Sequence, residues 1–382
     1  MIENIAGRLV PGAFAVGLAS AFLYCTYCGG VYSQRNPFPG FVRFYQALGP
    51  QSNFFPTVNQ LIALCKSRAS KSDILVVVGG NSTFLGVAQP VEEMWSGYLQ
   101  KNLGASFVVV NLAQRSAPPT AGAESVAEAL LKQGYKVIYV ANVLPPNWSE
   151  PDGNSTYNYL YWNAHARNLL FSWDVRDRYI AGHPVDLNQR KEWMIRARMD
   201  RVSNAEDLWN TMCYAQFCTA WDLFTGSGFW KPRIQFKDQE GPVLPVPERF
   251  ASDKARIVEA VRGMVKEPGG SAMDSKMWPN VEVQIAAGFV PQMRARSLIV
   301  VSTVSPYYIH QMSGDEQNRY ASFLRRSAEA YRNVGLHAME SGSLYNEADY
   351  KDAVHMLPSG GRRLANEVAP EVRSIAHEIY AQ

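Results

Sequence analysis

The chain has 382 residues and a formal net charge of +3, with 47% hydrophobic and 19% charged residues. This length fits one large domain, or a domain of average size with insertions, and the hydrophobic fraction supports a sizeable core. Acidic and basic residues are interspersed, without a basic stripe or an acidic tail. The composition therefore argues against a nucleic-acid-binding protein.

The N-terminal segment carries no charged residue from Leu9 to Gln34. A run of this length can cross a bilayer, so we expect a single-pass transmembrane anchor at residues 9–34 after a short tail at residues 1–8. A cleaved secretory signal peptide is the competing interpretation, but its apolar core should be shorter. Because few residues precede the anchor, we expect the rest of the chain to lie outside the cytoplasm, in the periplasm if the source is bacterial.

Strands and helices alternate in residues 57–144, which follow a juxtamembrane linker at residues 35–56. This alternation with short links predicts a doubly wound, mostly parallel α/β sheet. Apolar runs predict strands at residues 74–78, 106–112 and 136–143, and apolar residues at helical spacing predict helices around residues 58–65, 91–104 and 121–133.

The alternation stops in residues 145–292, which are rich in Trp, Tyr and Arg and which we interpret as a long insertion into the sheet. Within it, residues 190–201 fit either an ordinary helix or a helix on an anionic membrane surface. Residues 241–247 are expected to be an extended linker. Cys213 and Cys218 could form a disulfide in an oxidising compartment, a question that the spacing leaves open.

The alternation resumes in residues 293–382, which should complete the interrupted sheet. We predict strands at residues 297–305 and 336–339 and helices at residues 315–333 and 362–382.

A candidate nucleophile follows the first predicted strand, where Ile74 to Val78 run into Gly79-Gly80-Asn81-Ser82. Open α/β sheets carry their sites at the carboxyl ends of their strands, so Ser82 is well placed for chemistry. A strand-to-helix turn with a serine cap is the simpler alternative.

A serine hydroxyl needs a base to remove its proton. Of the six histidines, only His355 has an aspartate three residues before it, Asp352. The pair follows the last predicted strand and therefore lies at the same edge of the sheet as Ser82. We expect Asp352 to hold Nδ1 of His355 while Nε2 faces Ser82. The alternative is a loop histidine paired only with its own aspartate.

Four short segments resemble the conserved blocks of the SGNH (GDSL-type) hydrolase family. They are Gly80-Asn81-Ser82, the run from Asn111 to Ser116, Asn142, and the run from Asp352 to His355. The resemblance covers about residues 73–143 and 297–368, and it implies a three-layer, flavodoxin-like core.

The resemblance also implies roles for single residues. Ser82 would be the nucleophile, with His355 and Asp352 completing the triad. The oxyanion hole would combine the backbone N–H groups of Ser82 and Ser116 with the side chain of Asn142. No cofactor is implied, and no Cys/His cluster has zinc-ligand spacing.

Three positions depart from the family pattern: Asn81 stands where the family has Asp, Ser116 where it has Gly, and Val143 where it has Asp. The expected function is a membrane-anchored serine esterase or O-acyltransferase acting on acyl esters. The anchor suggests acetyl esters of a cell-envelope polysaccharide as the substrate. The departures leave a catalytically inactive binding module as the alternative, with a scaffold protein of a membrane assembly as another.

Overall fold

The computed structural model describes residues 11–22, 24, 43, 58–114, 117–120, 123–145, 244–265, 278–342 and 345–381. Several sequence predictions lie outside these residues. They concern Ser116, residues 190–201, the pair Cys213 and Cys218, and all but one residue of the linker at 35–56.

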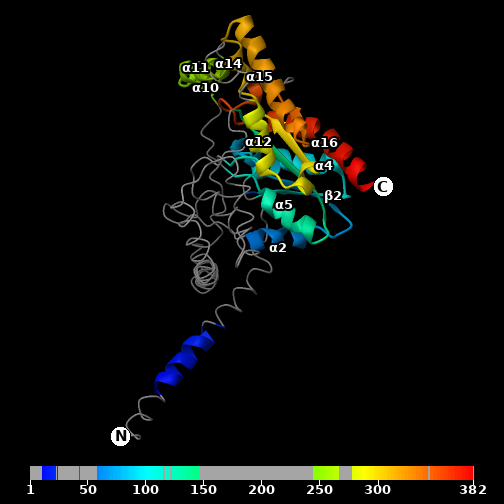
Figure 1. Cartoon of the computed structure of the whole chain (residues 1–382). Helices are drawn as coiled ribbons and strands as arrows, with labels where there is room; N and C mark the ends of the chain where they lie inside the picture. Colours follow the sequence, from blue (N-terminus) through cyan, green and yellow to red (C-terminus); the bar gives the residue numbers. More distant parts are fainter. Residues whose placement is uncertain are drawn as a thin grey trace.

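The described core is a five-stranded parallel sheet with the strand order β2-β1-β3-β4-β5 (Figure 1). This is the flavodoxin-like doubly wound order, so the predicted parallel α/β sheet is confirmed. The strands are β1 (Ile74–Val78), β2 (Phe107–Asn111), β3 (Lys136–Val143), β4 (Ser297–Val301) and β5 (His337–Glu340). All residues of β4 are buried, as expected for a strand covered on both faces.

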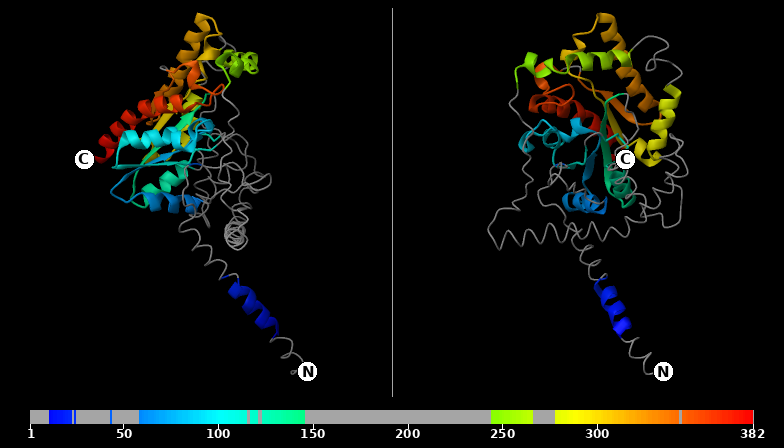
Figure 2. Two further views of the ribbon diagram at one scale, coloured as in Figure 1. Left: turned by 180° about the vertical axis from the view of Figure 1, so that it is seen from behind. Right: turned by 90° about the vertical axis from the view of Figure 1, so that its left-hand side faces the viewer.

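Helices cover both faces of the sheet. On one face, α4 (Trp95–Leu103) packs along α16 (Pro358–Tyr380), and the two lie side by side in Figure 2. The connection from β1 to β2, which contains α4, runs in one direction along the sheet, and the connections from β2 to β3 and from β4 to β5 run in the other. Because such crossovers are right-handed, the helices of these two connections lie on the other face. These helices are α5 (Ala123–Lys132), which packs against α2 (Val58–Arg68), and α15 (Gly314–Asn333), which packs against α12 (Trp278–Gly288).

Short helices fill several connections. They are α3 (Ser82–Leu85), η1 (Val91–Glu93), α10 (Val246–Ala251), α11 (Lys254–Met264), α13 (Pro291–Arg294), α14 (Pro306–Ile309) and η3 (Glu347–Asp349).

Three sequence predictions need correction. The linker expected at residues 241–247 overlaps α10, because a proline is tolerated in the first turn of a helix, where a backbone N–H has no intrahelical partner. The strand expected at residues 297–305 ends at Val301, and α14 follows at Pro306. The C-terminal helix begins at Pro358 rather than at residue 362, again with a proline in its first turn.

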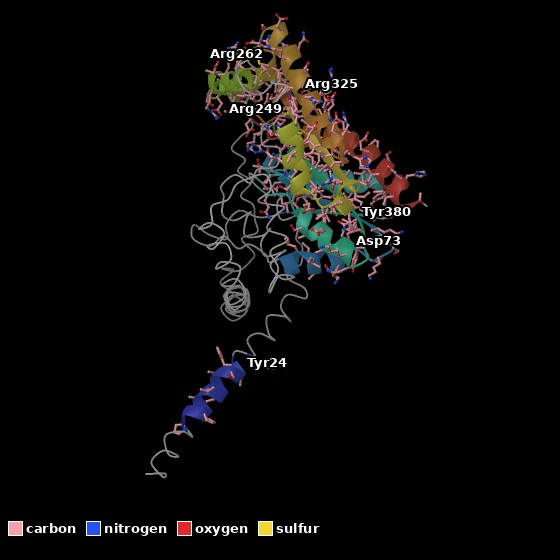
Figure 3. All side chains as sticks on the ribbon, in the orientation of Figure 1. Tyr24, Asp73, Arg249, Arg262, Arg325 and Tyr380 are labelled. Carbon is pink, nitrogen blue, oxygen red and sulfur yellow. The ribbon has the colours of Figure 1, made fainter. Side chains whose placement is uncertain are left out.

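At the N-terminus, residues 11–22 form a helix whose large apolar side chains are exposed, with Phe14 at 69% and Phe22 at 63%. Tyr24, labelled in Figure 3, is also helical. In the part of the chain that the structure describes, no helix is both long and apolar enough to cross a membrane. The remainder of the predicted anchor at residues 9–34 falls largely outside that part.

Candidate active site

The turn after β1 brings Ser82 to the carboxyl edge of the sheet. Gly80 has φ +92°, a conformation that side chains other than glycine rarely adopt, and a Cβ there would lie 2.3 Å from Oδ1 of Asn142. Asn81 then caps α3, since its Oδ1 accepts the backbone N–H of Thr83 at 3.0 Å. Ser82 is the first residue of α3, next to the end of β3 that carries Asn142.

The loop between η3 and α16 carries the other two predicted residues. Tyr350 and Met356 form an isolated antiparallel bridge that closes this loop. Within it, Oδ1 of Asp352 accepts the backbone N–H groups of Val354 at 3.0 Å and of His355 at 2.9 Å. These bonds hold the carboxylate against its own loop and leave its second oxygen for the imidazole.

The structure brings Ser82, His355 and Asp352 into one hydrogen-bonded chain. Nε2 of His355 lies 2.8 Å from Oγ of Ser82, and Nδ1 lies 2.7 Å from Oδ2 of Asp352. An ionised carboxylate can only accept, so Nδ1 carries the proton and Nε2 is free to accept the serine proton. The His355 side chain is 23% exposed and that of Asp352 is 44% exposed, so both side chains are accessible to solvent.

The electrostatics of the loop favour the ionised form of Asp352. Burial raises the pKa of this carboxyl, but the hydrogen bond and the charge of His355, together with the two backbone N–H groups, outweigh burial and lower the pKa below its ordinary value. A carboxylate that stays ionised at neutral pH stabilises the imidazolium that forms when His355 takes a proton.

Three contacts from other elements support the loop that carries Asp352 and His355. The hydroxyl of Thr83 donates to the carbonyl oxygen of Val354 at 3.4 Å, and the backbone N–H of Ser305 donates to that of Ala353 at 2.8 Å. The third contact comes from Gln89, a fully buried residue that donates to the carbonyl oxygen of Met356 at 3.2 Å. No pattern around Gln89 in the sequence signals this role.

The end of the insertion also touches this loop. Arg249 of α10, labelled in Figure 3, donates from Nη1 to the carbonyl oxygen of Tyr350 and from Nε to that of Leu244 at 2.9 Å. Phe250 of the same helix stacks on Tyr307 of α14, with ring centroids 4.8 Å apart. Helices that the sequence did not predict therefore support the loop that carries His355.

The structure describes two of the three residues predicted for the oxyanion hole, Ser82 and Asn142. The backbone N–H of Ser82 has no acceptor among the described residues, and Ser116 lies outside them. Asn142 is fully buried, and its Nδ2 donates to Oδ1 of Asn81 at 2.9 Å and to Oγ of Ser302 at 3.3 Å. Donation from Asn142 to a substrate would require it to give up one of these two contacts.

Within the described ranges, no three His, Cys, Asp or Glu side chains are grouped so that they could hold a metal ion. Cys65 is a buried free thiol in α2, and burial raises its pKa to about 12. A thiol of this kind is inert, so Cys65 is a packing residue rather than a second nucleophile.

No family model matches the chain, and no curated protein matches it. Two solved structures of the M. smegmatis aryl esterase, one native and one inhibitor-bound, align with 79% of this chain and 99% of theirs. The identity is 14% for the native form and 13% for the inhibitor-bound form, and the TM-score is 0.29 in both cases. A likeness of this extent carries no argument about activity.

Proposed function

We propose that the chain is a serine esterase-type enzyme that transfers acyl groups through Ser82, His355 and Asp352. One observation carries the proposal: the hydrogen-bonded chain from Ser82 through His355 to Asp352 joins residues up to 273 positions apart. A serine that only capped a helix would not require a histidine beside it. A loop histidine that only paired with its own aspartate would not require a serine beside it.

In the proposed reaction, Oγ of Ser82 attacks the carbonyl carbon of an ester while Nε2 of His355 takes the hydroxyl proton. The C–O bond to the leaving group then breaks, and His355 returns the proton to the departing alkoxide. The product of this half-reaction is an acyl-enzyme on Ser82. The negative charge on the carbonyl oxygen is met by the backbone N–H of Ser82, which is free to donate.

The second half-reaction sets the overall activity. His355 removes a proton from the acceptor, which attacks the acyl-enzyme and releases Ser82 with its proton restored. Water as acceptor gives an esterase, and a sugar hydroxyl gives an O-acyltransferase. We extend the proposal to acetyl esters of a cell-envelope glycan, handled by a membrane-anchored chain, because of the uncharged run at residues 9–34.

The alternative is an inactive binding module, as the departures at Asn81, Ser116 and Val143 suggested. The departures at Asn81 and Val143 leave the contacts among Ser82, His355 and Asp352 intact, which favours an enzyme over a binding module.

A fluorophosphonate probe tests the proposal on the full-length protein in detergent. Oγ of an activated serine forms a P–O bond and expels fluoride, whereas an ordinary serine does not react. We expect label on the peptide that carries Ser82, found by mass spectrometry, and none on Ser82→Ala. The matched control is Ser72→Ala, which removes an exposed serine close in sequence and should label like the wild type. A folded wild-type protein that takes no label at Ser82 would contradict the proposal.

A further inference from the structure

The loop that carries His355 is a closed unit with two ends, Tyr350 and Met356. Inside it, the backbone N–H of Lys351 donates to the carbonyl oxygen of His355 at 2.8 Å, and Oδ1 of Asp352 accepts the backbone N–H of His355 at 2.9 Å. Because these bonds run across the loop, the imidazole and its aspartate should move together with the backbone. The distance from Nε2 to the nucleophile therefore depends on what holds the two ends of the loop.

A side chain from outside the loop holds each of these ends. Gln89, which follows the nucleophile helix α3, donates to the carbonyl oxygen of Met356 at 3.2 Å. Arg249 of α10 donates from Nη1 to the carbonyl oxygen of Tyr350. Since α10 lies in the predicted insertion at residues 145–292, the second support of the loop comes from outside the core of the sheet.

The guanidinium of Arg249 is suited to hold two carbonyl groups at a fixed spacing. Its Nε donates to the carbonyl oxygen of Leu244 at 2.9 Å, so one planar group joins the chain before α10 to Tyr350. Burial lowers the pKa of Arg249, and among the described residues no carboxylate pairs with it. Arg249 therefore contributes two directed hydrogen bonds to backbone groups rather than an ion pair.

The helix that carries Arg249 is itself fixed beside the loop. The neighbouring residue, Phe250, is fully buried and stacks on Tyr307 of α14, with ring centroids 4.8 Å apart. Ser305, directly before α14, donates its backbone N–H to the carbonyl oxygen of Ala353 at 2.8 Å. The helix α10 therefore supports the loop directly through Arg249 and indirectly through α14.

We propose that Arg249 is a positioning residue for the acyl transfer, through which α10 holds His355 at the distance from Ser82 that proton transfer requires. This inference rests on the proposed acyl-transfer function. Arg249 acts on the reaction only through the carbonyl oxygen of Tyr350 and the loop that follows. Without Arg249, the loop keeps its internal bonds and the contact between Asp352 and His355, but Nε2 is no longer held beside Oγ of Ser82.

The test is the substitution Arg249→Leu in the full-length protein, assayed with p-nitrophenyl acetate. Small misplacements of a catalytic group are costly, so we expect kcat to fall about 10- to 100-fold with KM changed less than about threefold. The pH at which kcat is half-maximal should not change, because Asp352 still holds Nδ1 of His355. Arg249→Lys keeps the charge without the rigid pair of donors, so its kcat should lie between those of the wild type and Arg249→Leu.

Arg294→Leu is the matched control. Arg294 of α13 also donates to two backbone carbonyl oxygens, those of Phe289 at 3.4 Å and Ala286 at 2.8 Å, but neither belongs to the loop that carries His355. Its loss should lower the melting temperature, because two backbone groups lose their donor. Its kcat should stay within about threefold of the wild type, because the loop keeps its supports.

Wild-type kcat in a folded Arg249→Leu variant would overturn the inference and leave the acyl-transfer function intact. If Arg249→Leu does not fold, wild-type kcat in Arg249→Lys would overturn it in the same way. Equal losses of kcat in Arg249→Leu and Arg294→Leu would also overturn it, since they would reflect lower stability alone.

Two further results would assign Arg249 a different role and so overturn the inference. A raised KM with unchanged kcat would mean that Arg249 contacts the substrate. A shift in the pH of half-maximal kcat would mean that the charge of Arg249 acts on His355. A wild type without turnover that depends on Ser82 is a separate result, because it would overturn the proposed function and this inference together.

Discussion

The side-chain amide of Gln89 donates to the carbonyl oxygen of Met356, the residue directly after His355, at 3.2 Å. The other end of the same amide accepts the backbone N–H of Trp95 at 2.8 Å. Gln89 is fully buried and follows α3, the helix that begins with Ser82. Its side chain therefore connects the segment that contains Ser82 to the loop that contains His355. The distance between Ser82 and His355 should therefore depend on Gln89.

We expect Gln89→Leu to lower kcat for p-nitrophenyl acetate about 10- to 100-fold with little change in KM, because small misplacements of a catalytic group are costly. It should also lower the melting temperature, because it leaves the carbonyl oxygen of Met356 and the backbone N–H of Trp95 unpaired. Each unpaired buried group lowers the free energy of unfolding by about 1–3 kcal/mol. Gln100→Leu is the matched control. Gln100 bonds similarly to the backbone of Phe107 and Val109, outside the site, and its loss should cost stability alone. Equal kcat in the two variants would argue against a positioning role for Gln89.

Asp352→Asn separates the orienting role of Asp352 from its role in the loop. The amide oxygen can still accept the backbone N–H groups of Val354 and His355, so the loop should keep its shape. The amide nitrogen would face Nδ1 of His355 and favour the tautomer whose Nε2 carries the proton. We expect kcat to fall about 10⁴-fold with a nearly unchanged melting temperature. Wild-type turnover in this variant would show that Asp352 does not orient the base.

Glu367 of α16 should make stability depend on pH. Burial raises the pKa of this carboxyl, and the hydroxyl of Tyr345, the backbone N–H of Gly342 and the charge of Arg363 offset burial only in part. A carboxyl whose folded-state pKa is raised contributes stability that is complete below its unfolded pKa of about 4.3 and is lost as the pH rises through the folded value.

Glu367→Gln stays neutral and keeps an acceptor for the hydroxyl of Tyr345, which donates to Oε2 at 3.1 Å in the wild type. The variant should therefore melt higher than the wild type at pH 8, by roughly 1–2 °C because the half-buried group is screened by solvent. The difference should shrink toward pH 4. The measurement is thermal unfolding of both proteins between pH 4 and pH 8. A difference in melting temperature that grows on acidification would contradict a raised pKa of Glu367.

Gly80 is required both for its backbone conformation and for its contact with Asn142. Gly104 offers a matched control, because it has φ +89° but a Cβ added there would meet no atom within 4 Å. Strain from a positive φ costs about 1–3 kcal/mol and should be similar in Gly80→Ala and Gly104→Ala. Only Gly80→Ala should also displace Asn142 and lower kcat, by at least about tenfold. Equal kcat in the two variants would show that the contact with Asn142 is dispensable.

The sheet could be predicted from the sequence because its strands are uninterrupted apolar runs. The observed bounds of β3, Lys136–Val143, agree with the predicted ones. The pairing of Asp352 with His355 could also be predicted, since the two residues are close in sequence and share a loop. In contrast, α11 and α12 were not predicted, although buried apolar residues recur at helical spacing in both. They are Val258 and Val261 in α11, and Trp278, Val281 and Ile285 in α12.

The contact between Asn81 and Asn142 could not be predicted from the sequence. The contact depends on the parallel register that sets Val78 beside Val140, and on the close approach of Gly80 to Asn142. The sequence offers no sign that Nδ2 of Asn142 is already bonded. The family pattern assigned that donor to the oxyanion hole, whereas in the structure it is bonded to Asn81 and Ser302.

The central claim is that Ser82 and His355 act as one catalytic unit, and a double-mutant comparison of kcat tests it most directly. Ser82→Ala and His355→Ala should each lower kcat for p-nitrophenyl acetate about 10⁴- to 10⁶-fold, because a base without its serine has no proton to take. The double variant should lose little more than either single variant. If the losses multiply, or if Ser82→Ala keeps wild-type turnover, the two residues do not form a catalytic unit.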